Sequence, residues 1–159
     1  MKHKQTDTGR EFVLPRGALL VSTTGHDRCI TYCNPAFVEA SGYTRDELVG
    51  QSLDLLDHPD MPLEVGQALW TRLDAGMPWS GITKSRRKNG EHFWVRSTIA
   101  PIPSGGYMIV RTAALRAQVL AADAMYAAMR NKAARWIYEI EATAGGPPAG
   151  MPLRWWPTE

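Results

Sequence analysis

Cysteine is scarce in this chain of 159 residues, which contains only Cys29 and Cys33. On one strand, residues four apart point to the same face about 13 Å apart, which is too far for a disulfide. Reduced cysteines suit a cytoplasmic protein. His26 is near both cysteines in sequence, but no fourth ligand is close, so plain packing is favoured over a metal site.

The net charge is small, and long apolar runs are missing. The formal net charge is +2, and the local basic cluster Arg86, Arg87 and Lys88 is only three residues long. This balance gives no reason to expect a nucleic-acid partner. No apolar stretch approaches the ~20 residues that span a bilayer, and the polar N-terminus lacks the apolar region of a signal peptide. We therefore expect a soluble, cytoplasmic protein without direct membrane insertion.

The short motifs of common enzyme classes are missing as well. The sequence contains no phosphate loop, no GxGxxG, no HExxH and no GxSxG motif. No base is placed by sequence near a nucleophile. The chain is therefore expected to be a binding or sensing module and not an enzyme.

Turn residues divide the N-terminal part into an arm and a hairpin. Residues 1–17 are polar, contain Pro15 and Gly17, and are interpreted as a flexible arm. Residues 18–23 (ALLVST) and 28–33 (RCITYC) predict two strands, with turn residues between them.

Capping signals predict short helices after this hairpin. Asn34 is a good helix N-cap, and Pro35 suits the first helical position. Thr44 and Glu47 have the spacing of a capping box, which predicts a second short helix. The two prolines of the HPDMP segment exclude a continuous helix there, and Pro62 is expected to begin a longer amphipathic helix.

The remainder of the domain is predicted to be β-structure. Residues 79–88 and 91–101 form the expected strands of a hairpin, joined by a two-residue Asn89-Gly90 turn. A last strand is expected over residues 106–113. The predicted fold is α+β: a five-stranded antiparallel sheet with short helices over one face and a pocket between them.

A helix is predicted after the sheet, over residues 114–143, and a Gly/Pro-rich tail over residues 144–159. Apolar positions in this helix alternate in steps of four and three, as in a heptad seam. They are Leu115, Val119, Ala122, Tyr126, Met129, Ala133, Trp136 and Ile140. The seam predicts a mixed role, in which the helix packs onto its own domain and also forms a homodimer or docks to a receptor or kinase. Packing of the helix onto its own sheet alone is the simpler alternative.

Three segments together resemble a known family: HPDMP at 58–62, PWSG at 78–81 and RRKNG at 86–90. They are similar to segments of the flavin-binding PAS domains of bacterial aerotaxis receptors. The ALW, PWSG and RRKNG segments are also similar to the redox-sensing PAS domain of a nitrogen-fixation regulator. The resemblance covers roughly residues 18–130, and it implies a PAS domain over residues 18–113.

The resemblance implies a non-covalently bound FAD whose redox state reports oxygen or electron flow to a signalling partner. It places a set of residues of this chain at or near the cofactor. These candidate cofactor-binding residues are Asn34, Phe37, His58, Asp60, Trp70, Trp79 and Ser85.

Three positions depart from patterns of related domains. Asp57 stands where the aerotaxis pattern has Arg, and a carboxylate opposes a phosphate or an anionic reduced flavin. Ser85 replaces an Asn and loses the two-sided hydrogen bonding of an amide. Leu53 stands where photosensing PAS domains carry the cysteine that forms a flavin adduct, so a light-driven thiol adduct is not expected.

Simpler explanations exist for several of these residues. Asn34 is accounted for as a helix cap and Asp60 as a cap of the following helix, and tryptophans are common core residues. Two other functions stay open: a ligand-free PAS interaction module, favoured by Asp57 and Ser85, and a haem or small-metabolite sensor with His58 or His92 as the iron ligand.

Overall fold

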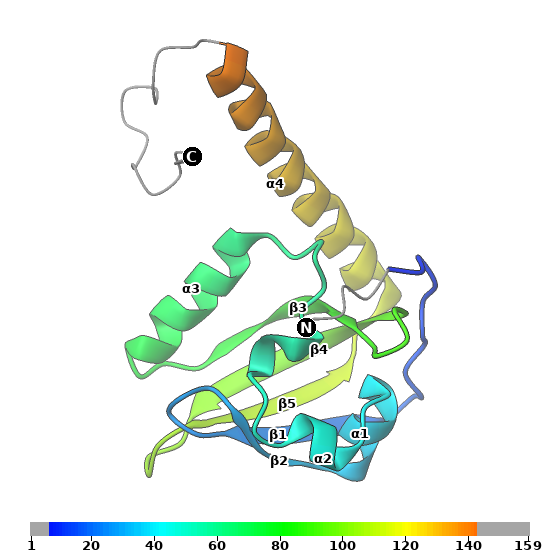
Figure 1. Ribbon diagram of the computed structural model, residues 1–159, viewed down its shortest axis with the longest axis vertical. Coiled ribbons are helices and arrows are strands. Elements are labelled where there is room, and N and C mark those ends of the chain that lie inside the picture. The colour runs from blue at the N-terminus through cyan, green and yellow to red at the C-terminus, as the bar shows by residue number, and fades with distance from the viewer. Residues whose placement is uncertain (1–6, 143–159) are drawn as a thin grey trace.

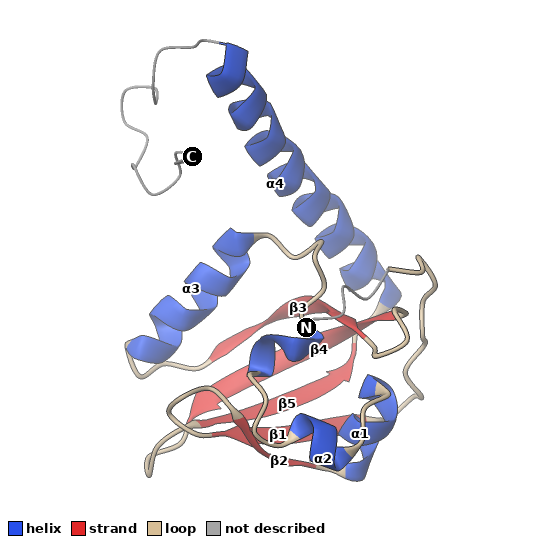
Figure 2. Ribbon diagram, in the orientation of Figure 1, coloured by secondary structure: helices blue, strands red, loops and turns tan. Residues whose placement is uncertain are grey.

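A computed structural model describes residues 7–142 of the chain, and the side chains of residues 7–133. Strands β1 (Leu19–Thr24), β2 (Ile30–Cys33), β3 (Trp79–Arg86), β4 (His92–Pro101) and β5 (Tyr107–Ala113) form one sheet. The strand order is β2-β1-β5-β4-β3, and all neighbours are antiparallel. This confirms the five-stranded antiparallel sheet predicted from the sequence (Figure 1, Figure 2).

The helices between β2 and β3 begin where the capping residues predict. Helix α1 (Pro35–Ser41) has Asn34 as its N-cap, and helix α2 (Arg45–Leu48) begins with a complete capping box from Thr44 and Glu47. A 3-10 turn, η1 (Leu53–Leu56), and helix α3 (Leu63–Asp74) follow. Pro62 precedes α3 directly, as expected for a proline that starts a helix.

The loop between β3 and β4 differs from the predicted two-residue turn. Of Asn89 and Gly90, only Gly90 has a positive φ, at 91°, whereas the predicted turn requires positive values at both residues. The Arg87 and Glu91 backbones still bond across the loop. Asn89 instead accepts the Glu91 N–H with its side chain, which stabilises a longer loop.

One face of the sheet, called the inner face below, is covered by α1, α2, η1 and α3. Side chains alternate along each strand, so Phe93 and Val95 of β4 point inward whereas Trp94 points outward. The largest buried apolar side chains between the sheet and these helices form one cluster. They include Leu20, Ile30, Phe37, Leu48, Leu56, Phe93, Val95, Ile99 and Ile109.

The described part of the predicted arm, residues 7–17, lies against the domain. The Phe12 N–H donates to the His92 carbonyl over 2.7 Å, and Glu11 pairs with His92 in a short parallel bridge. Leu14 is only 7% exposed. These contacts involve the apolar side chains at positions 12 and 14. The sequence analysis did not single them out, because most other residues of the segment are polar.

Helix α4 (Arg116–Ala142) packs on the outer face of the sheet, beside β3. Val119, Ala122 and Tyr126 of the predicted seam are buried against Trp94, and the two aromatic rings stack 6.4 Å apart. Leu115 is 69% exposed, and the side chains of the last seam positions lie outside the described residues. The middle of the seam therefore packs on its own sheet, and no helix within residues 7–142 has the length and apolar character of a membrane span.

The Tyr126 hydroxyl donates to the Ile82 carbonyl and fastens α4 to β3. Tyr126→Phe removes this bond and keeps the ring on Trp94, so we expect a loss of about 1 kcal/mol in the free energy of unfolding. Urea titration followed by circular dichroism measures the change. Tyr32→Phe alters an exposed ring on β2 and is the control. Equal urea midpoints for both variants would show that this bond does not stabilise the domain.

Candidate functional site

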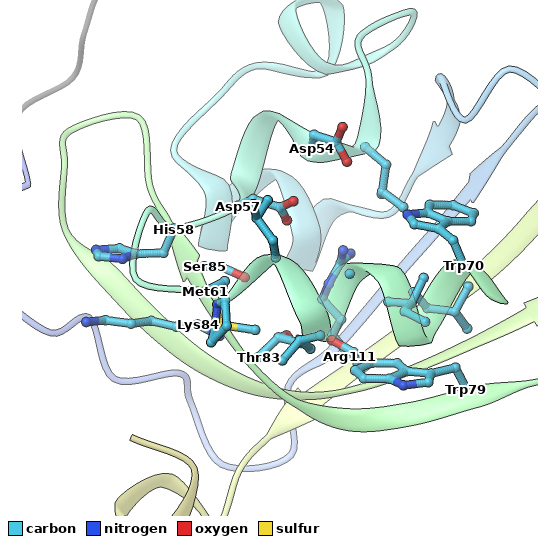
Figure 3. A pocket seen from close by; sticks show the side chains of 18 of the residues that line it. Asp54, Asp57, His58, Met61, Trp70, Trp79, Thr83, Lys84, Ser85 and Arg111 are labelled. Atoms are coloured by element: carbon cyan, nitrogen blue, oxygen red, sulfur yellow. Dashed lines mark hydrogen bonds between the residues drawn. The ribbon is translucent and has the colours of Figure 1, made fainter. Parts of the chain in front are cut away.

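A cavity of about 400 Å³ lies between the inner face of β3–β5 and the segment that runs from η1 into α3 (Figure 3). This volume falls in the range of roughly 300–1,000 Å³ that is common for small-molecule sites. Its lining residues are Leu53, Asp54, Asp57, His58, Pro59, Met61, Pro62, Leu63, Val65, Gly66, Leu69, Trp70, Trp79, Thr83, Lys84, Ser85, Ser97, Ile99 and Arg111.

Two tryptophans form one end of the cavity, Trp70 from α3 and Trp79 from β3 (Figure 3). The Trp70 ring packs edge-on against Tyr107, and the guanidinium carbon of Arg28 lies 3.5 Å from the Trp70 ring centroid. A methyl group at Gly81 would lie 2.5 Å from the Trp79 ring. Glycine at this position therefore lets the Trp79 indole lie along its own strand.

The floor of the cavity is polar. Thr83 and Ser85 of β3, Ser97 of β4 and Arg111 of β5 all line it. The hydroxyl oxygens of Thr83 and Ser97 are 2.9 Å apart, and Ser97 lies opposite Arg111 in the β-ladder. Strand alternation thus places a short polar strip across three adjacent strands, at the floor of the cavity.

Arg111 is the charged member of this strip and is only 7% exposed. Its guanidinium carbon lies 5.5 Å from the centroid of the Phe37 ring. Burial lowers the pKa of Arg111 to about 10, and Asp57 opposes the decrease. Within the described residues, its Nε and Nη1 atoms are buried without a hydrogen-bond partner. The cavity therefore contains a charged donor group that the protein itself does not satisfy.

Asp57 lies on the opposite wall of the cavity from Arg111 (Figure 3). Its backbone pairs with Ser85 in an isolated bridge, which holds η1 against the edge strand. The Asp57 residue is exposed to solvent, and its side chain lines the cavity. Burial raises the pKa of the Asp57 carboxyl to about 6, Asp54 adds to the rise, and Arg111 opposes it.

His58 and Asp60 belong to a polar cluster at the other end of the cavity. His58 Nδ1 accepts the Asp60 N–H over 3.0 Å, and Nε2 lies 3.1 Å from the Asp7 carboxylate. Burial lowers the pKa of His58, and Lys84 lowers it further, which favours a neutral ring with its proton on Nε2. Both ring nitrogens thus have protein partners, and neither is left for an iron ion. The Asp60 carboxylate binds Lys84 at 2.8 Å.

The structure brings four of the seven candidate residues to the cavity lining: His58, Trp70, Trp79 and Ser85. The other three, Asn34, Phe37 and Asp60, are not among the lining residues; a cofactor-binding role for them stays a prediction.

Asn34 and Phe37 have structural roles of their own. Asn34 Oδ1 accepts the N–H groups of Phe37 and Val21, and its Nδ2 donates to the Leu19 carbonyl, so the amide joins α1 to β1. Phe37 is fully buried in the core, below Arg111.

The sequence analysis did not single out Arg111, Thr83 or Ser97. The signal was present in the last strand, where Ile109 and Arg111 share one face by alternation. Because Ile109 belongs on the buried face, an arginine two residues later indicated a buried charge. Thr83 and Ser97 carried no comparable signal, because small hydroxyl side chains occur on either face of a sheet.

The sequence matches the family model described as PAS fold over residues 30–113. The aerotaxis receptor of Escherichia coli (strain K12) is 40% identical over 144 residues, which cover 86% of this chain and 28% of that protein. The nitrogen fixation regulatory protein of Klebsiella pneumoniae is 30% identical over 90 residues, 57% of this chain and 18% of that protein. The chain thus spans less than a third of either relative. These matches confirm the resemblance inferred from the three motifs.

Among solved structures, a light-oxygen-voltage domain whose mechanism was addressed with a flavin analogue is similar with a TM-score of 0.56. It is 22% identical in sequence, and the alignment covers 72% of this chain and 87% of that chain. At this level of identity the similarity concerns the fold. It supports the sheet and helix arrangement described above.

Neutralising Asp57 is expected to change how stability depends on pH. The carboxyl has a pKa of about 6 in the folded protein against an ordinary value of 3.8. Between these values the Asp57 carboxyl binds more protons in the folded state than in the unfolded state, so the contribution of Asp57 to the stability of the wild type falls as pH rises. Asp57→Asn lacks this loss. Its advantage in urea midpoint over wild type should grow from about pH 4 to pH 6 and stay constant above.

Asp123→Asn, which neutralises an exposed carboxylate on α4, is the matched control for this comparison. Its stability profile should run parallel to that of wild type. An Asp57→Asn profile that also runs parallel to wild type would contradict the raised pKa.

Proposed function

Because the chain belongs to the PAS fold family, we propose that it binds a flavin, FAD, non-covalently in this cavity and reports the redox state of the flavin to a signalling partner. The observation that carries the proposal is the cavity itself. It combines two tryptophan rings at one end with a buried guanidinium that has free donors. Its residues act by binding and sensing, so the proposed role is not enzymatic.

The lining fits a flat aromatic ring with polar edges. Trp70, Trp79, Leu69 and Ile99 provide apolar and aromatic surface for the faces of such a ring. Thr83 and Ser97 provide hydroxyl groups, and Arg111 provides buried, unpaired N–H donors for carbonyl oxygens. Buried donors without a partner are expected where a ligand completes the hydrogen bonding. Asp57 is paired with Ser85 near the end of β3, so both side chains would contact the same edge of the ring.

Arg28 supports a ligand with phosphate groups, as FAD has. Its guanidinium stacks on the Trp70 ring, beside the tryptophan end of the cavity. The Arg28 side chain is 42% accessible, and its contact with Asp74 is a long one of 3.9 Å. It is therefore available to a phosphate beside Trp70, and contacts between arginine and phosphate are strong because they are charge-assisted and often bidentate.

The chemistry that a flavin supplies is reversible electron uptake. The chain's own residues connect its cavity to α4 along two routes. Lys84 lines the cavity and binds Asp60, whose carbonyl accepts a bond of 2.6 Å from Arg130 of α4. Ile82 lies on β3 between the lining residues Trp79 and Thr83. Its carbonyl accepts a hydrogen bond from the Tyr126 hydroxyl of α4.

These contacts make α4 the proposed output element. A small shift of β3 changes the contacts that Tyr126 and Arg130 make with the domain. The apolar seam of α4 then becomes more or less accessible to a receptor, a kinase or a second copy of the chain. Such coupling requires that the two redox forms of the ligand favour different positions of β3.

The function is tested by the absorption spectrum of purified protein and by titration with FAD, FMN and riboflavin. We expect flavin bands that bleach with dithionite, and tightest binding for FAD. Trp79→Phe reduces the ring wall and should weaken binding up to about tenfold, from the roughly 0.5–1.5 kcal/mol of an aromatic contact. Trp94→Phe changes a tryptophan on the outer face and is the matched control. A colourless wild type that takes up none of the three flavins would refute the proposal.

A ligand-free interaction module is the second candidate, favoured by Asp57 and Ser85. Under this alternative the wild type binds no flavin, and the double variant Asp57→Arg, Ser85→Asn gains it. The same titrations distinguish the two functions, because the flavin-sensor proposal requires binding by the wild type.

A further inference from the structure

Arg111 occupies the middle strand of the sheet, where a charge is least expected. Strand β5 lies between β1 and β4, and Arg111 is opposite Leu20 on one side and Ser97 on the other. Its side chain is on the inner face and 7% exposed. Taking a guanidinium out of water costs several kcal/mol unless partners compensate for it.

The protein provides little of this compensation. Nε and Nη1 have no hydrogen-bond partner among residues 7–133, and no ion pair joins Arg111 to Asp57 in that part of the chain. The Phe37 ring lies below the guanidinium, at 5.5 Å. With a pKa near 10, Arg111 stays charged at neutral pH. Lys84, which also lines the cavity, differs in being bound by Asp60 at 2.8 Å.

Two nitrogens of the Arg111 guanidinium, Nε and Nη1, keep N–H donors that the protein leaves unpaired. Nη1 lies on the Cδ side of the planar group and Nε–H points to the opposite side, so the two donors point in different directions and each can serve a separate acceptor. Arg111 lines the cavity, so its guanidinium lies beside the space of the ligand, although the Nε and Nη1 atoms themselves are buried. The neighbouring Ser97 hydroxyl bonds with Thr83, over 2.9 Å, and does not pair with Nε or Nη1 of Arg111.

We propose that Arg111 recognises the acceptor edge of the bound ring and stabilises the anionic reduced ligand more than the oxidised one. This inference rests on the proposed flavin site and adds to it the residue that sets the preference between redox states. Two electrons and one proton convert the neutral oxidised ring into the reduced anion. A fixed cation beside the ring stabilises that added negative charge. Asp57, on the opposite wall, acts against it.

The test uses the full chain with FAD as the probe, in wild type and in Arg111→Met, Arg111→Lys and Arg96→Met. Arg96 is exposed on β4, so Arg96→Met is the same change away from the cavity. Binding of oxidised FAD is measured by fluorescence quenching, and binding of FAD reduced with dithionite by anaerobic equilibrium dialysis. Thermal unfolding of the flavin-free proteins is measured alongside.

We expect Arg111→Met to weaken binding of reduced FAD roughly 10- to 100-fold more than binding of oxidised FAD, the range for hydrogen bonds to a charged group. Arg111→Lys keeps the charge without the planar set of guanidinium donors, so it should retain part of the redox preference. Arg96→Met should match wild type. Flavin-free Arg111→Met should unfold at the wild-type temperature or above, because an unpaired buried charge is removed. A merely structural arginine would instead lower that temperature and leave the redox preference intact.

The outcomes separate this inference from the function on which it rests. If wild type and Arg111→Met bind both redox forms equally well, the flavin site stands and the role of Arg111 is overturned. An equal loss for both forms overturns the redox preference. If wild type takes up no FAD, the proposed function fails and this inference fails with it. Should Arg111→Met not fold, Arg111→Lys alone decides: a redox preference identical to that of wild type overturns recognition of the ring edge by the guanidinium donors.

Discussion

Pro59 and Pro62 prevent the chain from forming a continuous helix between η1 and α3, where it crosses the inner face of the sheet. A regular helix on this face would pack its side chains into the strands below. The bent segment stays above β3, tied to it by the bridge between Asp57 and Ser85 and by the His58 N–H, which donates to the Lys84 carbonyl. The space left below this segment is the cavity, and the proposed ligand contacts are the side chains that line it.

The charges around this cavity are arranged unevenly. At one end, His58, Asp7, Asp60 and Lys84 satisfy one another through short contacts. In the middle, Arg111 and Asp57 influence each other's pKa across the open space without forming an ion pair among the described residues. The first group is a finished structural cluster that links the N-terminal segment to β3. The second is unfinished, and an incomplete polar arrangement in a cavity is the physical sign of a binding site.

Local signals predicted most of the fold. Asn34, Thr44 and Glu47 determine helix starts through contacts with residues at most three positions away, so their roles could be inferred from spacing alone. Contacts between distant segments could not be inferred in this way. The docking of Phe12 onto His92 joins residues 80 positions apart. In the site, the tryptophans were predicted from motifs, whereas Arg111 was overlooked because arginine in a strand usually faces solvent.

The cavity and α4 share the edge strand β3, which gives the fold a physical means of output. Side chains of β3 point alternately toward the cavity and toward the outer face below Tyr126. A displacement of β3 caused by the ligand therefore also moves the side chains that contact α4. The account is tested most directly by a crystal structure of the chain grown with FAD. It predicts the ring system between Trp70 and Trp79, with an acceptor edge at hydrogen-bond distance from Arg111. A structure in which the chain's own side chains fill this space, or FAD lies elsewhere, would contradict it.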